Sequence, residues 1–385
     1  MSTQIYPEIS GRGRKTDHVL IASILLLTGV GLVTLYSSSY AFAERFFGNG
    51  LYFIKRQLIM CCLGIVLFFI SSIISIEWLR RFVKLFVLGC IILNILTFVP
   101  GIGKQMNGAS RWIEIGNFSF QPSELVKLIL PFYLAHIFDK KREDIDNLSR
   151  GIIPPALITG VFFVLIFLQN NFSTAVFLVL NALFIFFLAG IKFRYFFSAI
   201  FMFIPTAAIL VLKKEHRIRR FLSYIKPDFE PQGAGYQVNS SILSVTSGGF
   251  WGKGIGQGTR KISSVPEVHS DFIFSSFAEE AGFLGVVLIV FLFAVFAVRG
   301  YASSMRNENP FNRLFGCGLV TMIVSQVLLN IAVAAGALPA TGIPLPFFSA
   351  GGSSLGASLI MAGLIVNISR HSKTESSSGE VYNGI

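Results

Sequence analysis

Charged residues are scarce in this sequence of 385 residues: Asp, Glu, Lys and Arg make up 14% of it, against 53% hydrophobic residues. A soluble domain carries about 25% charged residues, so the composition excludes an ordinary water-soluble globular protein. The sequence also lacks any segment in which apolar and polar residues alternate with a period of two, which argues against a transmembrane barrel. The chain is therefore expected to bury its apolar surface in lipid as helices.

Cysteine is also rare, and the four cysteines, Cys61, Cys62, Cys90 and Cys317, all lie inside apolar runs. They cannot link an external loop, and none has the spacing from histidine that a metal cage requires. We interpret them as small core residues. The net charge of +12 suits membrane lipids with anionic headgroups, and because it is spread over both faces it gives no reason to expect nucleic acid.

Long apolar runs, in contrast, are abundant. A bilayer core about 30 Å thick needs about 20 helical residues, and by this measure the sequence predicts about ten transmembrane helices. They are expected at 18–38, 55–75, 82–100, 122–138, 152–169, 172–190, 195–212, 272–298, 314–336 and 349–369. We expect an all-α, polytopic integral membrane protein with one transmembrane domain, 18–370, between an N-terminal segment, 1–17, and a disordered tail, 371–385.

The basic residues predict the orientation. With the N-terminus inside, Lys and Arg are more frequent in the inner segments than in the short outer connections. The positive-inside rule then places both termini in the cytoplasm and makes 213–271, between the seventh and eighth spans, a large external loop. Ala41-Phe42-Ala43 after the first apolar run could mark signal-peptide cleavage, but that run is longer than usual for a signal peptide.

The first polar motif joins Gly108-Ala109-Ser110-Arg111-Trp112-Ile113 to Gln121-Pro122-Ser123-Glu124-Leu125-Val126-Lys127. Pro122 suits a helix start, and Glu124 and Lys127, three residues apart, then share one helix face. Each alone at mid-bilayer would cost about 2.5–3.5 kcal/mol on insertion scales. One interpretation is an interfacial ion pair with Trp112 in the aromatic belt. The other is a polar cavity wall, with Arg111 facing an anionic headgroup and Trp112 forming a platform for a sugar or lipid.

Two further segments interrupt the apolar pattern. The glycine-rich run 247–258, with Lys253, is either a tightly packed re-entrant loop or a cradle for a lipid pyrophosphate. It has no Walker sequence, so a nucleotide is not expected. The run 339–354 combines three prolines with small residues and cannot be a plain span, so it is either buried in protein or lines a cavity. Ser349 and Ser353 in this run are candidate substrate-binding residues.

An acid and an imidazole stand where the long loop returns to the membrane, in Pro266-Glu267-Val268-His269-Ser270-Asp271-Phe272. A carboxylate at the mouth of a membrane cavity is a functional-site hypothesis by default. We therefore predict Asp271 as the catalytic residue, with His269 in a supporting role. The alternative for Asp271 is a helix-opening cap before Phe272.

Taken in order over residues 17–370, these motifs resemble the SEDS family (shape, elongation, division and sporulation; FtsW, RodA and SpoVE). The Tyr36-Ser37-Ser38-Ser39 stretch is more similar to the division branch, FtsW, than to the elongation branch, RodA. The resemblance implies ten transmembrane helices and a peptidoglycan glycosyltransferase of the bacterial cytoplasmic membrane that polymerises lipid II. In one departure from the family pattern, Asn171 stands where many members have an acid.

The resemblance also implies roles and partners. The essential acid of the family corresponds to Asp271 and its important tryptophan to Trp112, while Arg111, Glu124 and Lys127 occupy cavity-lining positions. The implied partners are lipid II, the undecaprenyl-pyrophosphate-linked glycan and a class B penicillin-binding protein that crosslinks the new strand.

The expected chemistry is attack of a sugar hydroxyl on an anomeric carbon. Asp271 would act as general base, and Arg111 with Lys253 would stabilise the departing pyrophosphate. A divalent cation, Mg²⁺ or Mn²⁺, between Asp271 and the phosphates is left open. The alternative functions are a transporter (flippase) of the lipid-linked precursor and a scaffold without activity.

The predicted topology can be tested by labelling. A single cysteine introduced within 228–234 should react with a membrane-impermeant thiol reagent in intact cells, because the positive-inside rule places this segment outside. Labelling that occurs only after lysis would contradict the topology and, with it, the external location of the Asp271 site.

Overall fold

The computed structural model describes residues 16–106, 108–116, 118–145, 147–198, 200–201, 205, 218–219, 222, 224–225, 234–258 and 270–370. Most of this part of the chain is helical. The long ones are α1 (His18–Phe47), α2 (Tyr52–Ile73), α4 (Val83–Leu96), α5 (Pro122–Lys140), α6 (Ile153–Leu168), α7 (Phe172–Leu188), α10 (Ala234–Ser247), α12 (Ile273–Met305), α13 (Pro310–Ala334) and α14 (Gly352–Arg370). Short helices are α3 (Ile76–Arg81), a 3₁₀ turn (Arg142–Asp144) and a π turn (Leu148–Ile152).

Six helical segments among the described residues are long and apolar enough to cross a membrane: α1, α2, the continuous stretch Leu148–Leu168 that contains α6, α12, α13 and α14. Helices α4 and α7 are apolar but shorter. The prediction of an all-α, multi-pass membrane protein is confirmed. The span expected at 195–212 and the segments 1–15 and 371–385 lie largely or wholly outside the described residues, so the count of ten spans stays a prediction.

Local sequence signals set the helix starts. The Asp17 carboxylate accepts a hydrogen bond from the Leu20 N–H at 3.0 Å and so caps α1. Arg299, near the far end of α12, forms an ion pair with the same carboxylate at 2.8 Å. Pro122 opens α5 as its first residue, as predicted, because a proline there removes only an N–H that has no partner within the helix.

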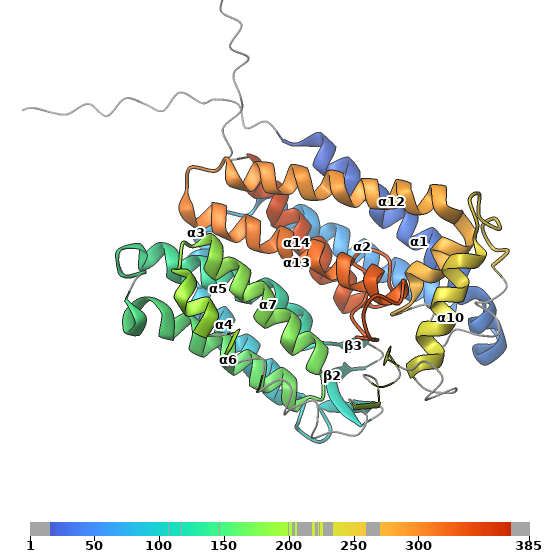
Figure 1. Ribbon diagram of the computed structural model, residues 1–385, viewed down its shortest axis with the longest axis horizontal. Coiled ribbons are helices and arrows are strands. Elements are labelled where there is room, and N and C mark those ends of the chain that lie inside the picture. The colour runs from blue at the N-terminus through green and yellow to red at the C-terminus, as the bar shows by residue number, and fades with distance from the viewer. Residues whose placement is uncertain are drawn as a thin grey trace, which may run out of the picture.

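Helix α13 is the centre of the bundle. It packs against α5, α7, α10, α12 and α14, and most of its length is buried. Figure 1 shows α4, α5, α6 and α7 gathered in one half of the molecule and α1, α2, α12, α13 and α14 in the other. Because α13 touches both halves, polar groups on it can connect the motifs carried by each.

Helix α14 approaches α2 closely through small residues. A Cβ atom added at Gly363 would lie 2.4 Å from the Phe68 carbonyl oxygen and 2.0 Å from Ser71 Oγ. At the same end of this interface, the Asn367 amide donates to the carbonyls of Ser71 (3.0 Å) and Ile74 (2.6 Å). In lipid the hydrophobic effect does not drive helices together, because the lipid tails are as apolar as the helix surfaces. Close packing at small residues and hydrogen bonds from side-chain amides hold the helices together instead.

A small antiparallel sheet, ordered β1-β2-β3, precedes α5. Its strands are Gly103–Met106, Ala109–Ile115 and Phe118–Phe120. Sequence analysis did not predict it, because short strands without one uniformly apolar face give no clear period of two. The sheet matters for the site, since it carries Arg111 and Trp112 next to the start of α5 (Figure 1).

The α2–α14 contact yields a stability prediction. Gly363→Ala should lower the thermal stability of the detergent-solubilised protein by about 1–3 kcal/mol, because the new methyl group collides with backbone and overpacks the interface. Gly356→Ala is the matched control on the same helix, since a Cβ there meets nothing within 4 Å. It should be neutral or stabilising by up to about 1 kcal/mol through helix propensity. Equal unfolding temperatures for the two variants would contradict this packing.

Candidate functional site

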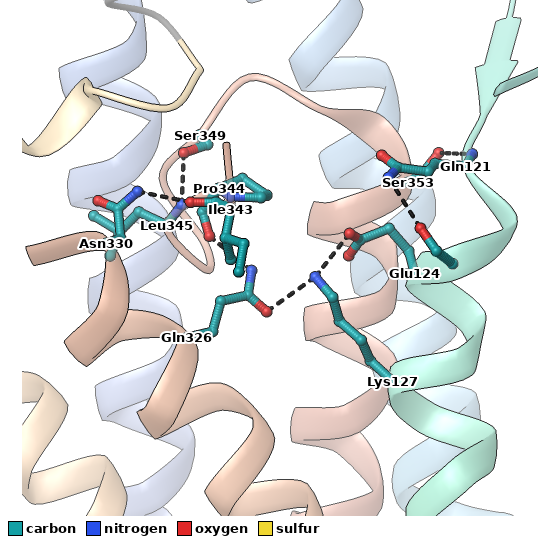
Figure 2. A network of polar contacts seen from close by, with 11 residues as sticks. Gln121, Glu124, Lys127, Gln326, Asn330, Ile343, Pro344, Leu345, Ser349 and Ser353 are labelled. Carbon is teal, nitrogen blue, oxygen red and sulfur yellow. Dashed lines mark hydrogen bonds and ion pairs between the residues drawn. The ribbon is translucent and has the colours of Figure 1, made fainter. Parts of the chain in front are cut away.

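The centre of the candidate site is a buried ion pair on α5. Lys127 Nζ lies 2.7 Å from Glu124 Oε1, and the two side chains are 1% and 4% exposed. The ammonium also donates to Gln326 Oε1 of α13 at 3.1 Å (Figure 2). The contacts place the pair inside the bundle rather than on its outer surface, as the interpretation of a polar cavity wall requires. A buried charge without its partner is strongly destabilising, so each member depends on the other.

Two amides of α13, one helical turn apart, reach the proline-containing segment that follows this helix. Gln326 donates to the Pro344 carbonyl at 2.7 Å. Asn330 donates to the Ile343 carbonyl at 2.9 Å and, with the same nitrogen, to the carbonyl of Asp271 at 2.9 Å. Helix α13 thus connects the ion pair, the proline segment and the predicted catalytic residue.

The segment 339–351 is non-helical, as its prolines predict, and neighbouring side chains bind its backbone. Ser349 Oγ accepts from the Leu345 N–H (2.8 Å) and donates to the Ser270 carbonyl (2.5 Å). Gln57 of α2 donates to the Ser349 carbonyl (3.2 Å) and accepts from the Gly351 N–H (3.3 Å). The broken backbone is therefore held by protein groups, as non-helical backbone at membrane depth must be.

Asp271 lies beside this segment. It is partly buried, immediately before α12, and a Cβ added at Gly342 would lie 3.4 Å from Asp271 Oδ2. Gly342 has a φ of 71°, a conformation that suits glycine. The structure therefore brings the acid and the proline segment together, although about 70 residues separate them in the sequence. His269 lies outside the described residues.

Ser353 connects the proline segment to the first motif. Its hydroxyl accepts a hydrogen bond from the Gln121 N–H at 3.1 Å (Figure 2). The same hydroxyl donates to the Ser119 carbonyl at 3.4 Å. Gln121 directly precedes α5, so this contact fixes the start of the helix that carries the ion pair.

Arg111 and Trp112 lie on β2, at the edge of this region. Arg111 donates from its guanidinium group to the carbonyl of Asn170, in the turn between α6 and α7. Asn170 in turn donates to the Gly108 carbonyl at 2.8 Å and has a φ of 59°. Arg111 is thereby positioned next to Asn171, where the sequence departs from the family pattern. Trp112 is half-buried and pairs with Lys104 across the sheet.

The glycine-rich run forms a separate unit at the start of α12. Lys253 Nζ lies 2.7 Å from Glu279 Oε1, and the backbone N–H groups of Lys253 and Gly254 donate to the carbonyls of Glu279 and Glu280. The Gly256 N–H donates to Ser37 Oγ, which itself donates to the Glu280 carboxylate at 2.7 Å. These contacts match the tightly packed loop rather than the phosphate cradle, because the amides face protein acceptors beside two buried carboxylates.

Sequence analysis named the charged members of the site but missed its amides. Gln57, Gln326 and Asn330 are each 5% exposed or less, and all hold the proline segment. The signal available was a pair of amides four residues apart in an apolar run, which places them on one helix face. No group of three or more metal-ligating side chains occurs in the described part of the chain, so the residues seen here do not form a metal site by themselves.

The fold and site define a class: a multi-pass helical membrane protein whose buried ion pair and partly buried acid are joined by a polar network. The chain matches the family model described as "Cell cycle protein" (FTSW_RODA_SPOVE) over residues 17–374. This protein belongs to that family, the SEDS family that the motifs predicted.

Named relatives agree with this membership. The chain is 36% identical over 357 residues to "Probable peptidoglycan glycosyltransferase FtsW" of Geobacter metallireducens, covering 93% of this chain and 95% of the relative. It is 36% identical over 358 residues to "Stage V sporulation protein E" of Bacillus subtilis, covering 93% and 98%.

Solved structures share the fold. A chain from a study of how a peptidoglycan synthase complex coordinates polymerization and crosslinking has a TM-score of 0.77 at 29% identity, covering 92% of this chain and 98% of that one. The rod shape determining protein RodA of Thermus thermophilus has a TM-score of 0.68 at 26% identity, covering 94% and 98%.

The buried pair predicts strong coupling. Glu124→Gln and Lys127→Met should each lower stability by about 3–5 kcal/mol, because each leaves an uncompensated buried charge, while the double variant should recover much of the loss. Thermal unfolding of the four proteins in detergent gives the coupling energy.

Lys104–Glu114 is the matched control, an ion pair of similar length (2.6 Å) whose side chains are 43% and 46% exposed. Its coupling should not exceed about 1 kcal/mol. Additive effects at Glu124 and Lys127 would show that the buried pair does not act as a unit.

Proposed function

We propose that this protein is a peptidoglycan glycosyltransferase that polymerises lipid II into glycan strands during cell-wall synthesis. Its membership of the FtsW, RodA and SpoVE family supports the proposal, as does a relative of 36% identity that carries the name of this activity. The observation that carries it is the placement of Asp271, a partly buried acid held against the proline segment and linked through α13 to the buried ion pair.

In the proposed reaction, Asp271 is the general base. A sugar hydroxyl of the acceptor attacks the anomeric carbon of the donor, and the carboxylate takes the hydroxyl proton. The bond between the anomeric carbon and the lipid pyrophosphate breaks, and the pyrophosphate leaves with the bonding electrons. A positioned base contributes about 10²–10⁴-fold to such a step.

The leaving pyrophosphate needs positive charge or N–H donors. Among the cations of the site, Lys127 is paired with Glu124, and Lys253 with Glu279. Arg111 lies on β2, which contacts α5, and its guanidinium group carries several N–H donors in a planar fork that suits phosphate oxygens, so we assign the contact with the phosphates to Arg111. Trp112, adjacent on β2, would then offer its ring to the sugar or lipid.

The proposed activity also requires lipid-linked substrates, a partner enzyme and a defined orientation in the membrane. The substrates are lipid II and the undecaprenyl-pyrophosphate-linked strand, and the partner is a class B penicillin-binding protein. The structural similarity to a chain from a peptidoglycan synthase complex supports such a partner. Both termini would be cytoplasmic in the bacterial inner membrane, with 213–271 outside.

The decisive variant is Asp271→Asn, which keeps the size of the side chain but removes the base. Polymerisation of purified lipid II in detergent should fall by at least about 10²-fold, while expression and thermal stability stay near wild type. Asp271→Glu should also be poor, because a misplacement of about 1 Å can cost about 10²-fold.

Asp139→Asn is a matched control at the other end of α5. Asp139 pairs with Arg80, so this variant loses an ion pair but should still polymerise. Glu267→Gln and His269→Ala should retain more activity than Asp271→Asn.

Normal glycan synthesis by a well-expressed Asp271→Asn protein would refute the proposed mechanism. The protein would then be a flippase of the lipid-linked precursor or a scaffold without activity, and a flipping assay in vesicles would distinguish these two.

A further inference from the structure

We infer that Asn330 is a positioning residue, which holds the backbone of Asp271 at a fixed place against the proline segment. This inference rests on the proposed function. The Asn330 side-chain nitrogen donates to the carbonyls of Asp271 and Ile343, both at 2.9 Å, so one amide group joins the segment before α12 to the segment after α13.

The orientation of this amide is determined by its contacts. A side-chain amide nitrogen has two N–H groups, and both are used here. Rotating the amide by 180° would set Oδ1 against two carbonyl oxygens, which is repulsive. The Asn330 side chain is 1% exposed, so the donor itself is shielded from solvent. The two carbonyl groups are therefore held at a distance fixed by a single rigid group.

The two ends of the amide differ in their contacts. Asn330 Oδ1 is buried and accepts no hydrogen bond from the residues that the structure describes. An apolar side chain here would remove that buried acceptor, but it would leave the carbonyls of Asp271 and Ile343 without this donor. The contribution of asparagine at this position therefore comes from the two bonds that its nitrogen makes.

Side chains from other elements bind the backbone that precedes α12. The residue at the N-cap of α12 is Phe272, and no side chain caps the helix start. The contacts that hold the 270–271 backbone come from other elements: Asn330 binds the Asp271 carbonyl, and Ser349 binds that of Ser270. Without Asn330, the carboxylate would move relative to the acceptor hydroxyl, and general-base catalysis is sensitive to shifts of about 1 Å.

The test compares two buried asparagines that make the same kind of contact. Asn367 of α14 is 2% exposed and also donates to two backbone carbonyls, those of Ser71 and Ile74. Asn330→Ala and Asn367→Ala should lose similar thermal stability. Only Asn330→Ala should lower kcat for lipid II polymerisation, by at least about 10-fold, with KM changed by less than about twofold.

A second measurement does not depend on activity. Hydrogen exchange followed by mass spectrometry should show faster amide exchange in 271–276 and 342–349 for Asn330→Ala, and no change there for Asn367→Ala. If Asn330→Ala does not fold, Asn330→Gln keeps an amide donor but displaces it by one methylene, and should give the same loss of kcat and the same exchange change.

The outcomes separate the two hypotheses. A selective fall of kcat with faster exchange supports the positioning role. Unchanged kcat in Asn330→Ala, or an equal fall in Asn367→Ala, overturns it. If Asp271→Asn polymerises normally while Asn330→Ala still changes the exchange of 271–276, the proposed function fails but the structural contact between Asn330 and Asp271 stands.

Discussion

The non-helical segment between α13 and α14 is held inside this bundle by side chains that bind its backbone. Non-helical backbone in a membrane protein is tolerated only where it is buried in protein or lines a water-filled cavity. Gln326 and Asn330 of α13 and Gln57 of α2 donate to carbonyls of the segment, and Ser349, within it, accepts from the Leu345 N–H. The rest of the candidate site is arranged around the segment that they hold.

The same requirement explains the charges. Lys127 is 1% exposed and is stable there because Glu124 balances its charge and Gln326 accepts a further N–H. Glu279, 0% exposed, is paired with Lys253 in the glycine-rich loop. Asp271 differs from both acids, since it is only partly buried and lies where the long loop enters the bundle. A base for an external substrate needs that combination of support and access.

The comparisons with known proteins identify the family, and the geometry shows how the candidate site is held together. The family match and the relatives define what kind of protein the chain is, over nearly its full length. They do not indicate how Asp271 is held. The contacts of Asn330 and Ser349 supply that part, and they connect the residues just before the eighth expected span, the proline segment and α13 into one structural unit.

The sequence by itself determined the class and most of the helix positions, and it indicated the charged residues of the candidate site. Apolar runs must match the thickness of the bilayer, and a charge inside such a run is costly enough to indicate a site. It did not determine that the Glu124–Lys127 pair lies inside the bundle rather than at its surface, that β1–β3 form a sheet, or that the glycine-rich amides face Glu279 and Glu280. Nor did it indicate Asn330, because an amide in an apolar run has no charge to mark it. Those features depend on which helices pack together, and α13 packs against residues far from it in the sequence.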